Sequence, residues 1–370
     1  MPFRRLMKRL GAGCVISEFV SAHAVIHAKA QKNRYLKFHE EETPFGFQLF
    51  GGDEKILVEA AKKVESLGAD FVDINLGCPV PKVTKKGGGS AWLCHPVELG
   101  KLLADLKAAL NIPLTIKIRT GWDSESINAR EIINIAANEG VEWVAIHGRT
   151  RAQGYSGAAD WEMIRELAES SSVKIVGNGD LVTGALSAAR LLQSNCAGVM
   201  IGRGALKNPW IFLEAVEALN RLKAMDEAER SATVEAIIAK QSLPPSGDVP
   251  EGKQYYEKKV KQLQPTPVNF VADWARVRKD RDLMLLINLH LSFLREVYPE
   301  IRAQLNFRKF LAWYSAGYPG SHKFRKDIFT SKDFDQVVQR ALEFFDGVKS
   351  LGDQADSLRE SSPVLMRGHG

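Results

Sequence analysis

Short apolar runs of strand length alternate with amphipathic stretches of helical length between residues 12 and 204. The candidate strands are residues 14–16, 45–49, 71–75, 114–119, 143–147, 174–177 and 198–201. Apolar residues recur at helical spacing in residues 57–67, 99–110 and 127–138. This alternation predicts a parallel sheet with crossover helices. We expect an α/β fold, with a (β/α)8 TIM barrel as the first expectation and a doubly wound open sheet as the second.

The strands number one fewer than a closed barrel requires. Seven candidates are present, whereas the barrel has eight. The chain opens with Pro2-Phe3-Arg4-Arg5-Leu6, which is typical of a helix with proline in its first turn. We therefore expect the first barrel strand to be missing.

The 370 residues exceed the length at which a single core stops growing, so we expect two domains. Residues 1–221 should form the barrel. Residues 222–265 are polar and contain Pro and Gly, which indicates a linker or insertion. Residues 266–350 return to helical periodicity and predict a small helical domain. Residues 351–370 should form a flexible tail.

Charge is concentrated near the C-terminus. The chain carries a formal net charge of +6, and residues 276–326 hold 11 Lys and Arg against 4 Asp and Glu, so +7. A polyanionic partner is the expectation. No apolar run reaches the roughly 18 residues that span a membrane. The four cysteines show no CxxC pairing, so we expect a cytoplasmic protein with free thiols. We also expect a monomer without a metal.

Polar and glycine residues recur where the candidate strands end. In chain order they are Gln48, Asn75, Cys78, Lys117, Arg119, His147, Arg149, Arg151, Asn178, Gly179, Asp180, Gly202 and Arg203. The carboxyl ends of parallel strands share one edge, and ligands bind at that edge. The sequence therefore predicts a binding site there.

The loops after the last two strands suggest that the ligand carries a phosphate. Glycines in Gly177-Asn178-Gly179-Asp180 and Ile201-Gly202-Arg203-Gly204 would let backbone N–H groups approach phosphate oxygens, and Arg203 would add a charged fork. The same glycines could serve only as turn residues.

Lys117 and His147 each allow two interpretations. Lys117 lies in an apolar run and either points inward towards an anion or faces outward. His147 is either a ligand contact or a core histidine. A lysine and a histidine beside an electron-rich ring would stabilise negative charge gained on reduction, which is how a protein tunes a flavin.

Cys78 follows a buried strand in the run Asp73-Ile-Asn-Leu-Gly-Cys-Pro79. Most cysteines are structural, and Cys14, Cys94 and Cys196 are assigned to that class. The strand-end turn favours a chemical role for Cys78. Because no adjacent base is apparent in the sequence, a proton donor fits better than a nucleophile.

Together, DINLGCP, GGGSAWL, KIRTGWD, IHGRTR, GNGD and IGRGALKNPWIF resemble the tRNA-dihydrouridine synthases, most closely the bacterial B-type branch. The resemblance covers about residues 3–213. The chain lacks the Pro-Met-Ala-type segment that usually forms strand one in this family. Residues 222–280 depart from the family in length and composition. The resemblance implies an FMN enzyme that reduces uridine in tRNA with NADPH.

Residue roles follow from the same resemblance. FMN would bind Gln48, Lys117, Asn178, Gly179, Asp180, Gly202 and Arg203, with His147 also contacting the flavin. Hydride would pass from flavin N5 to uracil C6, and Cys78 would protonate C5. Asn75 would orient the base, with Arg149 and Arg151 also contacting the substrate.

The tRNA must extrude its target base to reach such a site. The candidate RNA contacts in the basic segment are Arg308, Lys309, Lys323, Arg325 and Lys326. Trp313 and Tyr314 either stack on bases or belong to the core. Two alternatives remain, an FMN barrel enzyme acting on a free pyrimidine, like dihydroorotate dehydrogenase, and a tRNA-binding paralogue without flavin.

Overall fold

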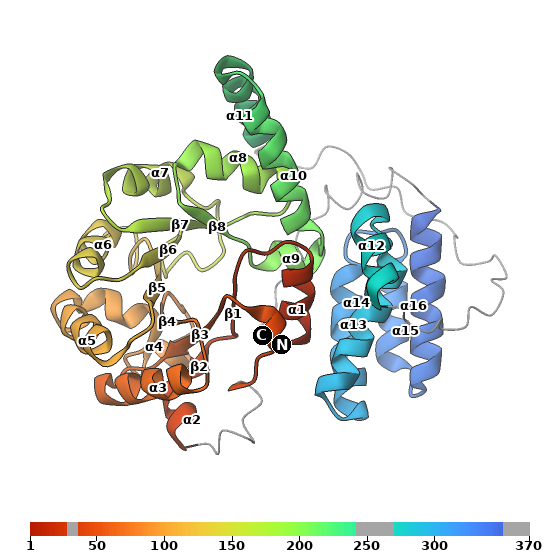
Figure 1. Ribbon diagram of the computed structural model, residues 1–370, viewed down its shortest axis with the longest axis horizontal. Helices are drawn as coiled ribbons and strands as arrows, with labels where there is room; N and C mark the ends of the chain where they lie inside the picture. The colour runs from red at the N-terminus through yellow and green to blue at the C-terminus, as the bar shows by residue number, and fades with distance from the viewer. Residues whose placement is uncertain (28–35, 242–269, 351–370) are drawn as a thin grey trace.

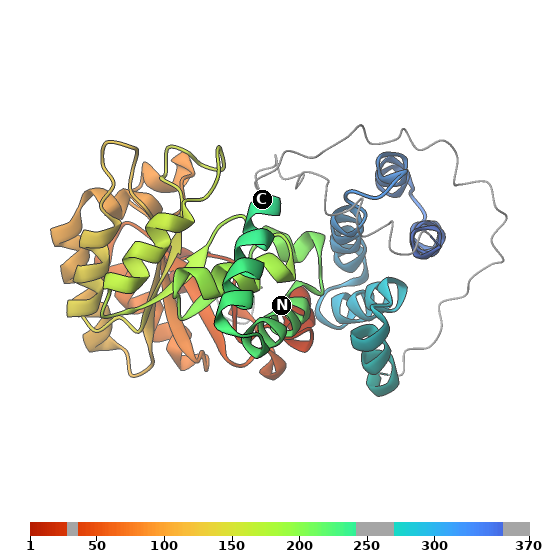
Figure 2. The same ribbon diagram turned by 90° about the horizontal axis from the view of Figure 1, so that it is seen from above.

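The computed structural model describes residues 1–27, 36–241 and 270–350. A curled parallel sheet with helices around it forms one lobe, and a group of C-terminal helices forms the other (Figure 1). The view turned by 90° shows the two lobes side by side (Figure 2).

All strand pairs in the sheet are parallel, in the order β1-β3-β4-β5-β6-β7-β8, with β2 also paired to β3. Their bounds are β1 Val15–Ile16, β2 Val20–Ser21, β3 Phe45–Phe50, β4 Phe71–Leu76, β5 Leu114–Arg119, β6 Trp143–His147, β7 Lys174–Asn178 and β8 Gly198–Met200. The α/β fold and the parallel sheet are confirmed. Strand β2 is an addition, because two residues are too few to show a periodic pattern.

The sheet is a curled arc that stays open in the described part of the chain, where no pairing joins β8 to β1. Residues of these two edge strands are half-buried, whereas the apolar residues of central strands are buried, such as Ile74 in β4 and Ile116 in β5. The two edges therefore bury less surface than the middle of the sheet.

Helices cover the outer face of the arc (Figure 1). They are α2 Ala22–His27, α3 Glu54–Ser66, α5 Pro96–Ala109, α6 Ala129–Asn138, α7 Trp161–Ser170 and α8 Gly184–Ser194. Short helices lie in the loops, namely η3 Glu40–Glu42, α4 Pro81–Thr84 and η4 Gly89–Cys94. Alternate strand residues, such as Ile116 and Ile118, join the apolar residues of these helices in one core. The polar strand residues lie on the inner face of the sheet, away from these helices.

The second lobe consists of α12 Phe270–Asp280, α13 Leu283–Val297, α14 Glu300–Tyr314, α15 Ser321–Thr330 and α16 Phe334–Lys349. The apolar run at 283–297 coincides with α13. Tyr314 is only 1% exposed and belongs to the core, while Trp313 is half-buried.

One apolar core joins the two lobes. Helix α1 (Pro2–Arg9) contributes Leu6, α9 (Arg203–Lys207) and α10 (Ile211–Ala224) frame Trp210, and all pack with residues of the helical lobe. The Trp210 indole donates to the Val277 carbonyl at 3.0 Å. The helical lobe is therefore packed onto the sheet lobe and does not rest on a linker alone.

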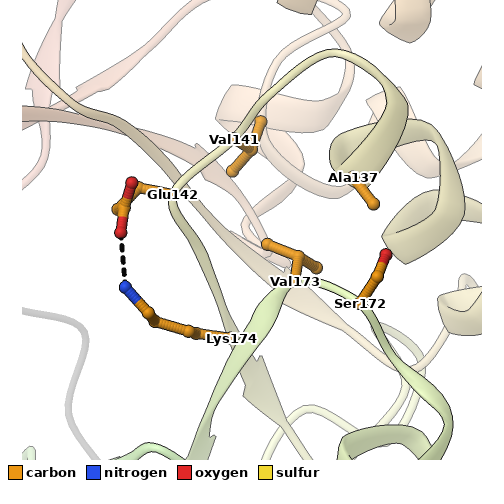
Figure 3. A pocket seen from close by; sticks show the side chains of 6 residues that line it. All are labelled: Ala137, Val141, Glu142, Ser172, Val173 and Lys174. Atoms are coloured by element: carbon orange, nitrogen blue, oxygen red, sulfur yellow. Dashed lines mark hydrogen bonds and ion pairs between the residues drawn. The ribbon is translucent and has the colours of Figure 1, made fainter.

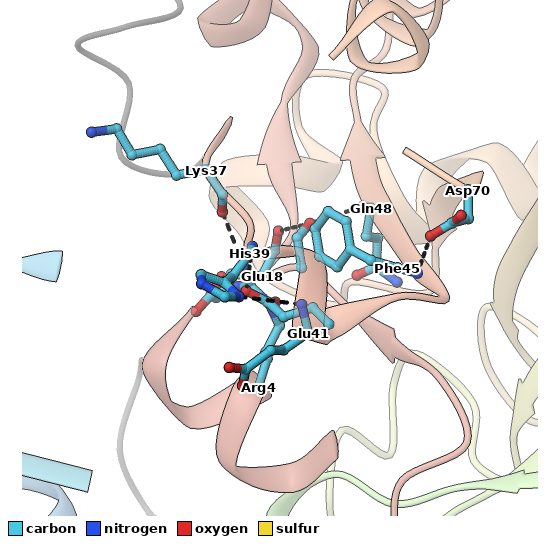
Figure 4. A network of polar contacts seen from close by, with 10 residues as sticks. Arg4, Glu18, Lys37, His39, Glu41, Phe45, Gln48 and Asp70 are labelled. Atoms are coloured by element: carbon cyan, nitrogen blue, oxygen red, sulfur yellow. Dashed lines mark hydrogen bonds and ion pairs between the residues drawn. The ribbon is translucent and has the colours of Figure 1, made fainter. Parts of the chain in front are cut away.

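A polar network fixes α1 to the start of the sheet (Figure 4). Arg4 donates to Glu42 at 2.5 Å and to Glu18 at 2.6 Å. Glu42 is fully buried, and its other oxygen accepts the His39 N–H at 3.0 Å. The Arg4–Glu42 pair lies inside the protein and has both partners satisfied.

Part of the expected linker is helical. Helix α11 (Glu227–Gln241) follows α10 and packs on α8 with Val234 as its buried residue. Its sequence is rich in Ala and Glu, which favour helix without forming a strong apolar stripe. Its polarity had indicated a linker. Residues 242–265 and the expected tail, 351–370, lie outside the described residues.

A shallow pocket lies at the amino ends of β6 and β7, the edge opposite to the predicted site (Figure 3). Lys174 and Glu142 form a 2.6 Å ion pair beside it, and Ser172 and Val173 complete one wall. These groups are paired with each other and exposed. No helix among the described residues is long and apolar enough to cross a bilayer.

Candidate functional site

The polar residues predicted from the strand ends lie on one face of the sheet. Register pairs Asn75 with Lys117, Arg119 with His147, and His147 with Asn178. Because strand residues alternate between faces, these side chains point to the same side and away from the helices. Lys117 therefore takes the inward orientation, with Thr115 on its own strand.

A buried hydrogen-bond network lies at the β3–β4 end of this row. Gln48 donates to Asp73 at 2.7 Å and accepts from Asn75 at 2.8 Å, while Thr115 donates to Asp73 at 2.6 Å. Burial raises the pKa of Asp73 to about 6, although the hydrogen bonds from Thr115 and Gln48 and the charge of Lys117 oppose it. The network fixes Gln48 and Asn75 in place.

Asn75 also shapes the turn that carries Cys78. Its side-chain oxygen accepts the N–H of Gly77 at 3.2 Å and of Cys78 at 2.9 Å. Ser90 donates its N–H at 3.2 Å and its hydroxyl at 2.6 Å to the Cys78 carbonyl. Gly89 has φ +60°, and a Cβ there would lie 2.8 Å from that carbonyl oxygen, so the close approach requires glycine.

The Cys78 thiol is kept protonated. It is 6% exposed, and burial raises its pKa above the ordinary value, against smaller opposing effects of the Val80 backbone and the Arg119 charge. A neutral thiol can donate a proton but is a poor nucleophile. The environment therefore suits an acid.

Lys117 is a cation without a partner among the described residues. In the part of the chain that the structure describes, its ammonium makes no hydrogen bond or ion pair. Burial and the nearby Arg119 charge lower the pKa of Lys117 to about 8, while Asp73 acts in the opposite direction. An anionic ligand atom at this point would restore its charge.

His147 is neutral, and its tautomer is fixed. Arg149 lies 3.2 Å from Nε2 of His147, and because arginine can only donate, Nε2 must accept and Nδ1 must carry the proton. Burial first, then the charges of Lys117 and the nearby arginines, lowers the pKa of His147 to about 2. His147 therefore offers a neutral N–H donor.

Arg149 and Asp180 bind each other. Two hydrogen bonds of 2.9 and 2.8 Å join them, and Arg149 also donates to the carbonyls of Ser156 and Gly157. Asn178 spans from β7 to β8 by donating to the Met200 carbonyl at 2.7 Å. These predicted ligand residues thus hold the loops of the site together.

Gly202 and Arg203 leave space for a ligand, whereas Gly179 is closely packed against Ala159. Gly179 has φ +131°, and a Cβ there would clash with Ala159, whereas Gly202 has open space where a Cβ would stand. The Arg203 guanidinium lies 4.1 Å from the Tyr155 ring centre and has no hydrogen bond or ion pair within the described ranges. An anionic, phosphate-bearing ligand fits this set of donors.

Sequence reasoning missed Tyr155 and the anchoring of Arg119. Tyr155 is 57% exposed, and its ring centre lies 6.1 Å from that of His147. Arg119 donates to the carbonyls of Gly77 and Thr150 at 2.9 and 2.8 Å. An aromatic residue directly after Gly154, within the loop that follows β6, was the available signal for Tyr155.

The predicted RNA contacts lie apart from this site, on α14 and α15 of the helical lobe. Lys309, Lys323 and Lys326 are exposed, and Arg325 is half-buried. Arg308 instead donates to the carbonyls at 328 and 331 at 3.0 and 3.3 Å, where it caps the end of α15.

The chain is similar to a family model and to several known proteins. The dihydrouridine synthase family model matches residues 1–264. A probable tRNA-dihydrouridine synthase of Rickettsia prowazekii is 31% identical over 346 residues, which cover 93% of this chain and 90% of that protein. The tRNA-dihydrouridine synthase B of Pseudomonas putida is 38% identical over 345 residues, covering 93% and 87%. A probable tRNA-dihydrouridine synthase of Rhodobacter capsulatus is 43% identical over 223 residues, covering 59% and 68%.

Proposed function

This chain belongs to the dihydrouridine synthase family, and on that premise we propose that it reduces uridines in tRNA to 5,6-dihydrouridine, with FMN as cofactor and NADPH as reductant. The observation that supports the chemistry is a protonated Cys78 thiol at the same sheet edge as a row of cations. That arrangement combines an acid that can protonate carbon with cationic side chains that can bind an anion. We therefore do not propose the alternative of an FMN enzyme that acts on a free pyrimidine.

The donor set fits FMN. Arg203 and the open backbone at Gly202 would hold its phosphate, and Lys117 with the Nδ1–H of His147 would face the pyrimidine end of its ring. When bound, the flavin supplies the hydride that is added to C6 of the uracil. Gln48, fixed by Asp73, would contact the ring edge from the other side of the row.

The proton for C5 comes from Cys78 in this proposal. Its raised pKa keeps it as a thiol at neutral pH, and the hydrogen bond from its N–H to Asn75 fixes the direction of its side chain. Loss of the proton leaves a thiolate, which the Arg119 charge stabilises. Asn75 keeps one amide hydrogen free after its bond to Gln48, and that hydrogen can orient the base.

The helical lobe would hold the tRNA while the target base is extruded into the site. Exposed lysines on α14 and α15 supply the positive surface, and the shared core with α1 keeps that surface fixed relative to the sheet. We also propose that the enzyme acts in the cytoplasm as a monomer. All four cysteines are free, as expected in a reducing compartment.

The test is mass spectrometry of tRNA nucleosides after incubation with the protein, FMN and NADPH. Wild type should form dihydrouridine. Cys78→Ala should lower its formation by about a hundredfold or more while NADPH-driven flavin reduction continues. Cys94→Ala, which changes an exposed cysteine, is the matched control and should behave as wild type. Equal product from Cys78→Ala and wild type would remove Cys78 from the mechanism.

A further inference from the structure

Arg151 and Trp122 form a stacked pair at the mouth of the site. The Arg151 guanidinium carbon lies 4.2 Å from the centre of the Trp122 indole. Trp122 comes from the loop after β5 and Arg151 from the loop after β6. Both loops leave the carboxyl ends of their strands, the edge that carries Cys78.

Backbone hydrogen bonds fix the pair in position. Arg151 donates its N–H to the Gly121 carbonyl, and Ala152 donates to the Trp122 carbonyl, both at 2.9 Å. A Cβ on Gly121 would lie 2.2 Å from the Ser126 carbonyl oxygen, so the tight return of this loop requires glycine. The stack is therefore formed before any ligand arrives.

The Arg151 guanidinium has no acceptor in residues 1–27, 36–241 and 270–350. No hydrogen bond or ion pair involves it there, and its Nε is buried without a partner. The nearest acidic residue in sequence to Trp122 is Asp123, whose carboxylate is engaged with the Glu125 N–H and the Ser126 hydroxyl. The indole covers one face of the guanidinium, and Nε is buried, so the two terminal NH2 groups are the ones offered to a ligand, in the plane of the guanidinium.

Arg119 and Arg149 differ from Arg151 in this respect, whereas Arg203 also lies over an aromatic ring without a hydrogen bond or ion pair in the described residues. Arg119 donates to three carbonyls, those of Gly77, Thr150 and Gly154, and Arg149 is paired with Asp180. Such arginines hold loops. An arginine that is stacked and fixed but unpaired has the geometry that recognises a phosphate through two parallel hydrogen bonds.

Hydrogen bonds link this pair to the Cys78 turn. Arg119 donates both to the Gly77 carbonyl, next to Cys78, and to the Thr150 carbonyl, next to Arg151. On the Trp122 side, Asn128 donates to the Leu93 carbonyl at 2.8 Å and so ties the loop to η4, which packs on the Cys78 turn. We therefore expect a base placed against Cys78 to have its own backbone close to this pair.

We propose that Arg151, stacked on Trp122, binds a backbone phosphodiester of the RNA strand beside the extruded uridine, at a subsite separate from the phosphate position at Gly202 and Arg203. The inference rests on the proposed function for the identity of the nucleic acid. The same chemistry would also suit a phosphate of the reductant, and the experiment separates the two sources.

The experiment measures tRNA affinity against salt concentration for wild type and variants of the full chain. Arg151→Gln should weaken binding about tenfold at low salt and reduce the slope of log affinity against log salt by about 0.9, as expected for one lost phosphate contact. Trp122→Leu keeps the charge and should weaken binding about threefold with the slope retained. Arg165→Gln is the matched control, because Arg165 is ion-paired to Glu162 and Glu169 on α7.

Three results would decide against the proposal. Unchanged affinity and slope in Arg151→Gln would overturn the subsite. A raised KM for NADPH but not NADH, with tRNA affinity unchanged, would assign the subsite to the reductant and overturn the RNA assignment. Loss of affinity in Arg151→Lys as well, together with a lowered Tm, would show a structural role for the side chain.

Failure of the proposed function would look different. If wild type forms no dihydrouridine but Arg151→Gln still loses tRNA affinity and salt slope, the subsite stands and the proposed reaction does not. The binding measurement needs neither flavin nor NADPH, so the two outcomes stay distinguishable.

Discussion

The arginines of α1 and three cations of the sheet edge, Lys117, Arg151 and Arg203, are alike in charge but have opposite surroundings. In α1, Arg4 is paired with Glu42 at 2.5 Å and Arg9 with Glu41 at 2.7 Å. At the sheet edge, Lys117, Arg151 and Arg203 have no hydrogen bond or ion pair in the described part of the chain. The two sets of side chains carry the same charge and differ in whether the described part of the chain supplies an acceptor for it.

The difference concerns the free energy of folding: paired charges in α1 are compensated within the fold, whereas unpaired charges at the sheet edge destabilise it. A charge removed from water destabilises the fold unless a partner compensates it. The α1 pairs compensate within the chain and hold α1 against η3. The sheet-edge cations leave that compensation to a ligand, so their replacement should affect binding and stability in opposite directions.

Lys117→Met should give the clearest separation of the two regions. Loss of a charged hydrogen-bond donor of about 2 kcal/mol should weaken FMN binding about thirtyfold. The apoprotein should become more stable at pH 7, because the fold disfavours the Lys117 charge, as its lowered pKa shows. Fluorescence titration of FMN and urea unfolding of apoprotein measure the two effects.

The pH dependence of FMN binding gives a second check on Lys117. Since its pKa is lowered to about 8, the apoprotein holds the cation below that pH and loses it above. FMN affinity of wild type should therefore fall as pH rises through 8, and Lys117→Met should lack that fall. A folded-state pKa below the unfolded value also means that this group adds stability as pH rises from about 8 towards 10.5. Equal pH profiles would contradict the assignment.

Arg5→Met tests the paired region. Arg5 is 5% exposed at its side chain and bridges Glu296 of α13 and Glu41 of η3. Both carboxylates are partly solvated, so removal of Arg5 should cost about 1–2 kcal/mol of unfolding free energy. FMN affinity should stay unchanged. Thermal unfolding measures the loss, and Arg165→Met is the exposed control. An Arg5→Met variant that keeps its stability but binds FMN more weakly would contradict a structural role for Arg5.

Sequence alone located the strands and the residues at their ends, because buried parallel strands are apolar runs with abrupt limits. β5 and β6 match the expected ranges. The partners of those end residues could not be predicted. Arg149 and Asp180 were both expected to contact ligands, yet they pair with each other, since charge partners 31 positions apart meet only through the fold. The same holds for Asn75 and Gln48.

The weakest sequence signals were local. Helix α11 lacks a strong apolar stripe, so its polarity suggested a linker, although its propensity favours helix. Trp313 and Tyr314 left core and stacking open, and burial decides for core in Tyr314. The packing of α11 and the burial of Tyr314 both depend on the neighbouring elements against which each helix packs.

The helical lobe repeats the comparison on a smaller scale. Arg308 is engaged with two carbonyls at the end of α15, whereas Lys326 is exposed on the same helix pair. Lys326→Gln should weaken tRNA binding two- to threefold, reduce the salt slope by about 0.9 and leave Tm unchanged. Arg308→Gln should lower Tm by a few degrees, for about 1 kcal/mol of lost capping. A lowered Tm in Lys326→Gln, or an unchanged Tm in Arg308→Gln, would contradict this comparison. It would mean that hydrogen bonding within the chain does not distinguish structural cations from RNA-binding cations in this lobe.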